Sequence, residues 1–257
     1  MTTGLILLSI NIWGQFQTIR SEELVDLQTR FKNEKKITFE DALEQIQKAP
    51  KESNEEFTKR LTHVVSDSLV HIHWYREPDN SRFNQLVPIW ENYFLYFMGR
   101  FSGIPEFEKY HYTDYRRSIK RGIGICGDAS IVMSQILSDN NIENKIISFP
   151  EHVVVAAQIS SQEALIYDPD YGVVLQRSLS EIRAQPEIIK DLYLKAGHRI
   201  EDAALLQQLY DSPSKEWDGP QHFMTKKYYF ERVSYALKWP LPIVFIFIGL
   251  LIIKRKT

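Results

Sequence analysis

The chain has 257 residues, of which 44% are hydrophobic and 25% are charged. This length and composition predict one domain of about 150 to 200 residues with attached segments. The formal net charge is −2 and basic residues are interspersed with acidic ones, so we expect no nucleic-acid partner. A single cysteine excludes an intrachain disulfide and any multi-cysteine metal site.

The first 53 residues consist of an apolar start followed by a charged region. Residues 4–16 are apolar, but the run is short, polar side chains interrupt it, and no basic residue precedes it. We therefore expect residues 1–16 to be a signal anchor or a truncated membrane segment. Residues 17–53 are expected to form short charged helices, one of them capped by Thr38.

A domain with an N-terminal helical part is predicted over residues 54–211. Ser53 and Glu56 form a capping box that opens a helix over 54–74. A second, aromatic-rich helix is expected over 82–100. Its inward-facing side chains should be Trp90, Tyr93, Phe94 and Phe97.

A further helix is predicted to begin at Cys126, and the segments after it predict a sheet. Apolar residues recur along this helix at i, i+3, i+4, i+7 and i+8, counted from Ala129. Three β-prone runs follow, at 145–149, 152–159 and 164–168, and the pattern returns to helix over 178–211. A helix that leads into an antiparallel meander indicates an α+β fold.

A polar link and a membrane helix are predicted at the C-terminal end. Residues 212–234 have the composition of a juxtamembrane link. Residues 239–253 carry no charge and are followed by three cations, so a transmembrane helix with a basic tail is expected over 235–257. The positive-inside tendency places this tail in the cytoplasm and the preceding domain on the extracytoplasmic side.

Cys126, in the segment "RGIGICGDAS", has the surroundings of a nucleophile. The positive end of the helix that begins there would stabilise a thiolate. Gly122 and Gly124 permit tight turns and leave room for an acyl group. The backbone N–H of Cys126 would be placed to hold an oxyanion. The alternative interpretation is a small core residue that happens to be a cysteine.

Two polar residues at strand ends complete a possible thiol site. A nucleophilic thiol needs an imidazole to accept its proton, and the imidazole needs an acceptor that orients it. His152 opens one apolar strand, and Asp168, in "YDPDYG", ends the next. Each feature alone is ordinary, since the first is a polar strand end and the second an Asp–Pro turn. Together with Cys126 they predict a Cys–His–Asp group.

These three motifs together resemble the transglutaminase-like superfamily, whose members carry Cys, His and Asp in this chain order. The resemblance covers about residues 54–190 and is strongest over 121–176. It implies a papain-like core, in which the helix that starts at Cys126 packs on a small antiparallel sheet. It also implies that Cys126 is the nucleophile, His152 the base and Asp168 the residue that orients the imidazole.

The resemblance implies a membrane-anchored, bacterial-type thiol enzyme that performs acyl transfer or amide hydrolysis. Its substrate would be a peptide or another amide, and bacterial relatives more often resemble proteases or amidases than cross-linking enzymes. One alternative is a non-catalytic scaffold or binding module of a membrane assembly, with a partner in that assembly. A second alternative is a protein cross-linking transglutaminase.

We expect neither a metal nor a cofactor. The sequence lacks an acidic cluster like the calcium sites of animal cross-linking transglutaminases. His71 and His73 would point apart on the helix predicted over 54–74, and nothing nearby completes a metal site. A second oxyanion donor is expected upstream of the cysteine, and Trp90, Asn92 and Tyr115 are equal candidates for it.

The register between the strands predicted at 152–159 and 164–168 decides whether the Cys–His–Asp group can form. His152 shares a strand face with Val154, because side-chain direction alternates. A four-residue loop at 160–163 would place Asp168 opposite Val155, on the wrong face. An odd loop or a bulge would place Asp168 opposite Val154, with the backbones of Asp168 and His152 about 7 Å apart. We therefore predict the odd register.

Overall fold

The fold was analysed in a computed structural model that describes residues 1–24, 37–72, 74, 83–161 and 163–255. The chain divides into two compact units. The sheet unit comprises residues 23–73 and 112–225, and the terminal unit comprises residues 1–22, 74–111 and 226–257. Residues 74–111 therefore lie outside the unit that holds the sheet, although the sequence places them within one domain over 54–211.

A five-stranded antiparallel sheet forms the centre of the sheet unit, in the order β6-β5-β4-β3-β7. Its strands are β3 (Asn144–Ser148), β4 (Val153–Ala157), β5 (Leu165–Asp168), β6 (Val173–Ser178) and β7 (Lys215–Trp217). The three predicted strands are confirmed as β3, β4 and β5. β6 and β7 were not predicted, and β7 lies within the segment 212–234 that was expected to be a polar link.

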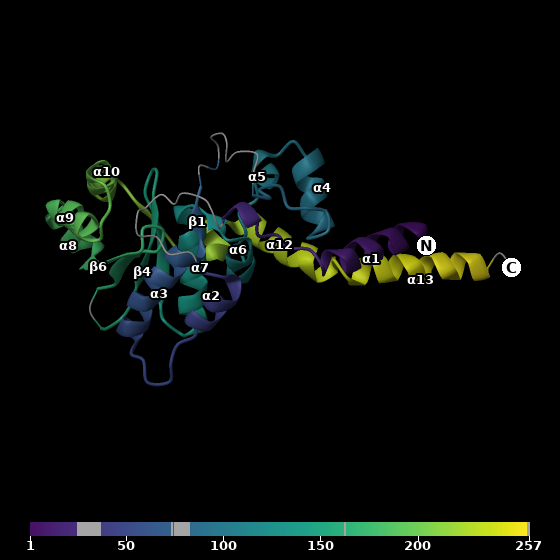
Figure 1. The fold of residues 1–257 in the computed structure, drawn as a ribbon, viewed down its shortest axis with the longest axis horizontal. Helices are drawn as coiled ribbons and strands as arrows, with labels where there is room; N and C mark the ends of the chain where they lie inside the picture. Colours follow the sequence, from purple (N-terminus) through teal and green to yellow (C-terminus); the bar gives the residue numbers. More distant parts are fainter. Residues whose placement is uncertain (25–36, 73, 75–82, 162, 256–257) are drawn as a thin grey trace. The chain divides into compact units, whose positions relative to one another are not determined.

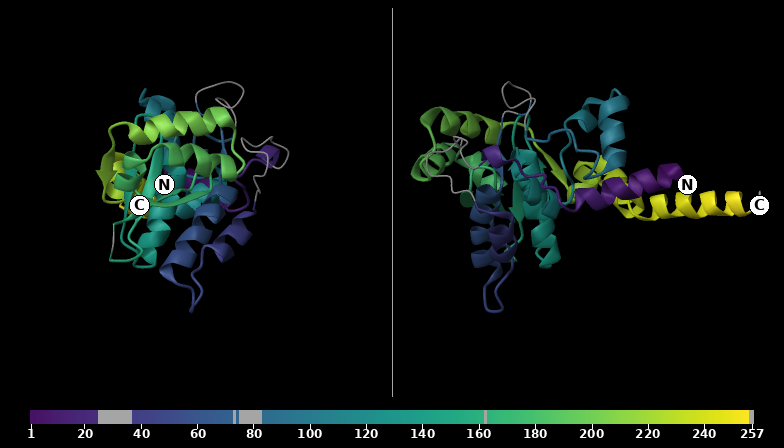
Figure 2. Two further views of the ribbon diagram at one scale, coloured as in Figure 1. Left: turned by 90° about the vertical axis from the view of Figure 1, so that its left-hand side faces the viewer. Right: turned by 45° about the vertical axis from the view of Figure 1, so that its right-hand side comes forward.

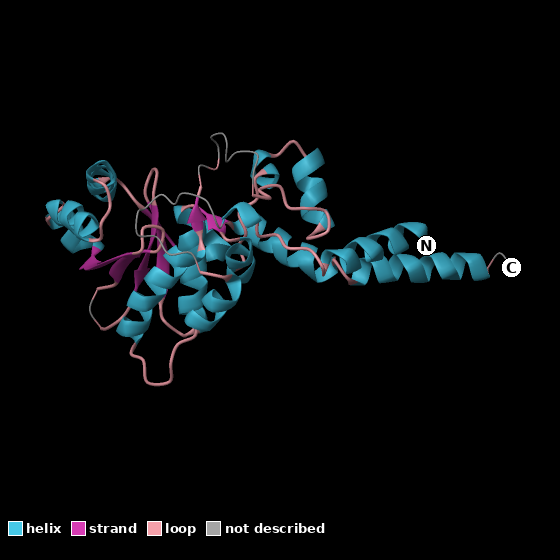
Figure 3. Cartoon of the chain, in the orientation of Figure 1, coloured by secondary structure: helices cyan, strands magenta, loops and turns pink. Residues whose placement is uncertain are grey.

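Helices cover both faces of this sheet, so the unit has three layers. One face packs against α3 (Asn54–Ser68) and α7 (Cys126–Asp139), and α2 (Phe39–Gln45) and α6 (Tyr115–Arg121) pack against these two helices in the same core. The other face packs against α8 (Leu179–Ala184), α9 (Glu187–Lys195) and α10 (Ile200–Asp211). Figure 3 shows the magenta strands between these two groups of helices. The short helix α11 (Pro220–Phe223) follows β7. The α+β prediction is confirmed.

Strand β4 is buried on both faces, which explains its continuous apolar sequence. Val155 and Ala157 belong to the core beneath α3 and α7, whereas Val154 and Ala156 belong to the core beneath α9 and α10. This alternation is the period-two geometry of a strand. His152 directly precedes β4 and shares the face of Val154, as predicted, and its ring lies beside Tyr210 of α10.

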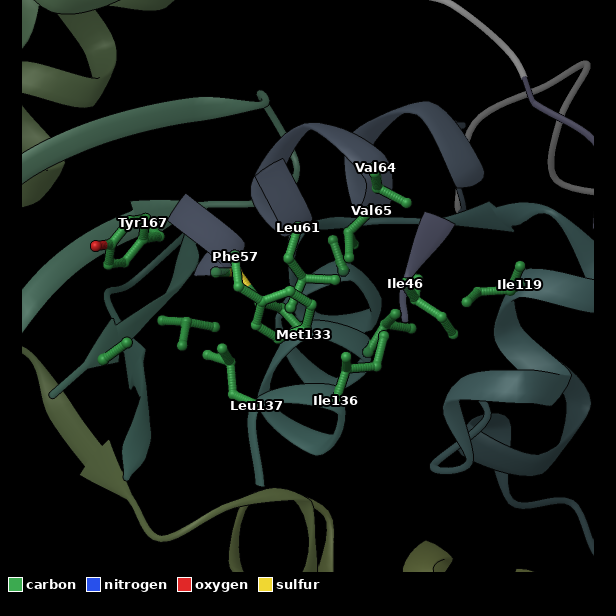
Figure 4. Packing of buried hydrophobic residues seen from close by; sticks show 14 of the residues in the cluster. Ile46, Phe57, Leu61, Val64, Val65, Ile119, Met133, Ile136, Leu137 and Tyr167 are labelled. Atoms are coloured by element: carbon green, nitrogen blue, oxygen red, sulfur yellow. The ribbon is translucent and has the colours of Figure 1, made fainter. Parts of the chain in front are cut away.

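The larger core joins α3 and α7. Met133, Ile136 and Leu137 of α7 pack against Phe57 and Leu61 of α3 (Figure 4). The fully buried side chains of this cluster each contribute about 1.5 to 3 kcal/mol by leaving water. This packing fixes the axis of α7 and, with it, the position of the first residue of the helix.

The helix predicted over 54–74 ends earlier. The Ser53–Glu56 capping box is present, but α3 stops at Ser68, and Val70–His71 form strand β1. β1 pairs in parallel with β2 (Ile123–Gly124), which directly precedes Cys126. Apolar residues continue past Ser68, so periodicity alone extends the helix. In the structure the β-branched Val70 instead pairs with Ile123, far along the sequence. His73 lies outside the described residues.

The terminal unit contains the two ends of the chain. Its helices are α1 (Thr2–Gly14), α4 (Tyr93–Phe101), α5 (Pro105–Glu108), α12 (Thr225–Leu237) and α13 (Pro240–Lys254). The short 3-10 helix η1 (Glu22–Leu24) follows α1. The helix predicted over 82–100 starts only at Tyr93, because Asn92 caps α4 and Pro88 lies in the irregular segment before it. Phe97, predicted to face inward, is 47% exposed.

Helices α1 and α13 lie side by side, with both chain ends at the same end of the pair (Figures 1 and 2). A Cβ added at Gly4 would lie 2.6 Å from the carbonyl oxygen of Pro242, so glycine permits this close approach. The side chain of Asn11 donates to the carbonyl oxygen of Lys238 at 2.6 Å. The apolar N-terminal segment is therefore a packed partner of the C-terminal one.

Among the described residues, no single helix is both long enough and apolar enough to cross a bilayer. Only α12 and α13 taken together reach that length and hydropathy, and they are bent by 46° at the break between them. The continuous helix predicted over 235–257 is thus divided. Pro240 and Pro242 at the start of α13 explain the break, because proline disfavours helical geometry in the residue before it and lacks the amide proton that would continue the helix.

Candidate functional site

Cys126 is the first residue of α7, as predicted. The side chain of Asp128 accepts a hydrogen bond from the backbone N–H of Ile125 at 2.9 Å and so closes the first turn. A Cβ added at Gly124 would lie 2.8 Å from the Cβ of Asp128, so the approach of β2 to this turn requires glycine. Cys126 is half-buried.

The β4–β5 pairing has the predicted odd register. Val155 pairs with Tyr167 and Ala156 with Ile166, so continuation by one residue places Asp168 opposite Val154. Nε2 of His152 lies 2.7 Å from Oδ2 of Asp168. The odd register therefore places the imidazole and the carboxylate on the same face of the sheet, where they meet.

The Asp168 carboxylate is fully buried and accepts four hydrogen bonds. Oδ1 accepts from the backbone N–H groups of Asp170 at 3.0 Å and Tyr171 at 3.1 Å. Oδ2 accepts from His152 and from the hydroxyl of Tyr193 in α9. Burial and the charge of Asp168 raise the pKa of Tyr193 well above 10, so its hydroxyl remains a donor. These donors hold the carboxylate in one orientation.

His152 is 4% exposed, and its environment favours the imidazolium form. Burial alone would lower the pKa of this imidazole. The negative charge and hydrogen bond of Asp168, together with a contact from Cys126, outweigh burial and raise the pKa of His152 well above 6.5. The ring is also enclosed by the edges of Tyr171 and Tyr210, with centroid distances of 5.6 and 6.4 Å.

The thiol and the imidazole lie within reach of one another. Cys126 Sγ and a ring nitrogen of His152 lie within 4.8 Å of one another. Because Nε2 is engaged by Asp168, Nδ1 is the nitrogen available to the thiol. All three predicted site residues are thus brought together, in the order thiol, imidazole, carboxylate.

Sequence reasoning missed three side chains at this site. Asp170 is only 8% exposed and lies within 4.8 Å of the reactive atoms of Cys126 and His152. Its Oδ1 is 2.7 Å from Nδ1 of His71, which β1 places beside Gly124. Tyr193 was missed because it lies in a helix 25 residues beyond Asp168. The spacing Asp168-x-Asp170 was visible in the sequence, but nothing indicated a histidine from β1.

The candidates for a second oxyanion donor have other contacts. The side chain of Asn92 accepts from the backbone N–H groups of Phe94 and Leu95 and donates to Ser234, all within the terminal unit. Trp90 also belongs to the terminal unit, and Tyr115 packs at the edge of the core between α3 and α7. Each of these residues therefore has a packing or capping role in its own unit.

The fold and the site define an α+β protein with a half-buried thiol beside a buried imidazole–carboxylate pair. No protein-family model, curated protein or solved structure matches this chain.

Proposed function

We propose that this chain is a transglutaminase-like thiol enzyme with a papain-like core, which transfers or hydrolyses acyl groups through Cys126, His152 and Asp168. One observation carries the proposal: His152 binds the buried Asp168 at 2.7 Å through Nε2, and a ring nitrogen of His152 lies within 4.8 Å of the Cys126 thiol. This is the order of contacts that an activated thiol needs, namely nucleophile, base and orienting acceptor.

In the proposed reaction, His152 holds the thiol proton and the Cys126 thiolate attacks an amide carbonyl carbon. The oxyanion is held by backbone N–H groups in the first turn of α7, which lack an acceptor within the helix. The C–N bond then breaks, and the imidazolium gives its proton to the departing amine. Water or a second amine attacks the thioester and releases an acid or a new amide, with the thiol restored.

Alkylation of the thiol tests the proposal. Cys126 is the only cysteine, so iodoacetamide labelling of the full chain, measured by mass spectrometry, reports on this residue alone. We expect labelling at pH 6 to be at least about tenfold faster than that of a free thiol, which ionises near pH 8.5. His152→Gln retains a donor for Asp168 but removes the base, and it should abolish this advantage.

His63→Ala is the matched control, because His63 is an exposed histidine on α3. It should label like the unmodified chain. If the unmodified chain and His152→Gln give the same pH profile, with a midpoint near that of a free thiol, the thiol is not activated and the enzyme proposal fails. A non-catalytic scaffold would give that result. Ammonia release with amine incorporation would distinguish a cross-linking transferase from a hydrolase.

We also propose that α1 and α13 together anchor the chain in a membrane, with the basic tail that begins at Lys254 in the cytoplasm and the catalytic domain on the extracytoplasmic side. The support is the apolar surface that the pair leaves uncovered. Large side chains are exposed along both helices: Leu5, Ile6, Ile12, Trp13, Ile243, Val244, Phe247, Ile248, Leu250 and Leu251. Contiguous exposed apolar surface of this kind is typical of a membrane or protein contact, and Lys254 and Arg255 follow the apolar run.

A further inference from the structure

Three side chains of different chemistry converge where the thiol lies. The ligand atoms of Cys126, His152 and Asp170 are all within 4.8 Å of one another. We propose that these residues bind a Zn²⁺ ion, which occupies the thiol and closes it to electrophiles and substrates. This inference goes beyond the proposed function and does not depend on whether the thiol catalyses a reaction.

The donor atoms fit a tetrahedral zinc site. Zinc bonds of about 2.0 to 2.3 Å to nitrogen, oxygen and sulfur place tetrahedral ligand atoms about 3.5 Å apart. The three atoms lie within 4.8 Å of one another, so side-chain shifts of the order of 1 Å would bring them to that spacing. A set of thiolate, imidazole and carboxylate suits zinc, whereas magnesium and calcium prefer oxygen ligands.

The groups around these ligands have the arrangement of a metal site's outer shell. An imidazole that ligates zinc usually donates its other ring N–H to a carboxylate, and His152 does so through Nε2 to Asp168 at 2.7 Å. Ligating carboxylates are themselves hydrogen-bonded, and Asp170 is bound by His71 at 2.7 Å. Both outer contacts already exist in the described residues, so only the shifts that close the ligand spacing are needed.

Burial and charge also favour a cation here. His152 and Asp170 are 4% and 8% exposed, whereas Cys126 is half-buried, so an ion would enter from the thiol side. A thiolate and the carboxylate of Asp170 at this separation repel one another, and a divalent cation that displaces a proton of the His152 imidazolium would interact favourably with both. Three protein ligands leave a fourth position for water.

Cobalt absorption provides a direct test. The full chain would be purified with a chelator, freed of it and titrated with Co²⁺. We expect one equivalent to give a thiolate-to-cobalt charge-transfer band together with the visible bands of a tetrahedral ion, and Zn²⁺ to displace both. Because the chain has one cysteine, a charge-transfer band can arise only from Cys126.

Substitutions assign the remaining ligands. Cys126→Ser should remove the charge-transfer band. Asp170→Asn removes a proposed ligand and should weaken Zn²⁺ binding at least about tenfold. His71→Gln removes only the outer contact of Asp170 and should weaken Zn²⁺ binding by at most about a hundredfold. Asp139→Asn, which changes an exposed carboxylate at the other end of α7, is the control and should bind zinc like the unmodified chain.

The unmodified chain gives a second readout that does not depend on any variant folding. One equivalent of Zn²⁺ should suppress iodoacetamide labelling of Cys126 at least tenfold, and a chelator should restore it. Absence of the charge-transfer band, or labelling that Zn²⁺ leaves unchanged, would overturn the zinc site. Equal zinc affinity in Asp170→Asn would overturn the three-ligand assignment. Failure of the enzyme proposal appears separately, as unactivated labelling in metal-free protein.

Discussion

At the scale of single residues, Asp168 is the centre of the site. Its two oxygens accept from an imidazole, a phenol and two backbone N–H groups, and none of its surface is exposed. A buried carboxylate is costly unless it is hydrogen-bonded, so these donors are a condition for its presence. Two of them come from the turn that follows β5, and two come from more distant segments.

The two buried tyrosines near this carboxylate should differ in their effect on stability. The hydroxyl of Tyr193 donates to the charged Oδ2 of Asp168, whereas the hydroxyl of Tyr210 forms a hydrogen bond with the uncharged hydroxyl of Tyr193, at 3.2 Å. We expect Tyr193→Phe to lower the free energy of unfolding by about 1.5 to 3 kcal/mol, and Tyr210→Phe by about 1 kcal/mol. Denaturant unfolding of the two variants measures the difference. Equal losses would mean that the charge of Asp168 does not strengthen its bond with Tyr193.

The stability of the protein should depend on pH through His152. Its pKa is raised in the folded protein above the unfolded value of 6.5, so the folded state binds the proton more tightly. The resulting stabilisation is complete below about pH 6.5 and is lost as the pH rises through the raised pKa. Asp168→Asn removes the charge responsible and should flatten this decline.

Unfolding at a series of pH values above 6.5 measures the effect. Asp139→Asn serves as the control, since this exposed carboxylate lies at the far end of α7 and should leave the slope unchanged. The same slope in Asp168→Asn and in the unmodified chain would contradict the assignment of the raised pKa to Asp168.

At the scale of elements, the first turn of α7 is set by its contact with β2. The parallel pairing of β1 with β2 places Gly124 against the turn, and its missing side chain allows Asp128 to approach. Gly127, in the same turn, differs, because an added Cβ would meet only the ring of Phe223, at 3.7 Å. The two glycines form a matched pair, one at a tight contact and one at an ordinary contact.

Alanine at these two positions should therefore have opposite effects. Gly124→Ala introduces a Cβ at 2.8 Å from another carbon and should cost about 1 to 3 kcal/mol of unfolding free energy. It should also slow labelling of Cys126, because the turn that carries the thiol must shift. Gly127→Ala should be neutral or stabilising by up to about 1 kcal/mol, since alanine favours a helix. Thermal unfolding and labelling rates check both, and a stable, fast-labelling Gly124→Ala would contradict the argument.

At the scale of the whole molecule, the α1–α13 pair contrasts with the sheet unit. The sheet unit buries apolar side chains on both faces of its sheet, whereas the helix pair keeps glycines at its contact and leaves large side chains outside. Phe247 and Leu251 are 63% and 60% exposed. Small residues at a helix contact and apolar residues outside are typical of helices that pack within a bilayer.

Charge on this surface should release the chain from membranes. Lysine near the middle of a spanning helix costs about 2.5 to 3.5 kcal/mol, so Phe247→Lys with Leu251→Lys should move the full chain from the membrane pellet to the alkaline-carbonate supernatant. Ile200→Lys, at a residue of α10 that is 54% exposed, is the control and should remain in the pellet with the unmodified chain. An unmodified chain that needs no membrane or detergent to stay in solution would end the anchor proposal.

Local patterns in the sequence determined the parts of this protein that depend on neighbouring residues. The capping box at Ser53 and the start of α7 at Cys126 follow from side chains within one helical turn. The apolar alternation and the need for His152 and Asp168 to share a face together predicted the odd β4–β5 register. The chain order of Cys, His and Asp likewise came from sequence alone.

Only the tertiary structure decided where long-range pairing overrides local preference. The end of α3 at Ser68 and the strands β6 and β7 depend on which segment each residue meets in space. Tyr193, Asp170 and His71 reach the thiol site from α9, the β5–β6 turn and β1. Their sequence separations carry no periodic signal, because hydrogen bonds and packing in a folded core depend on distance in space.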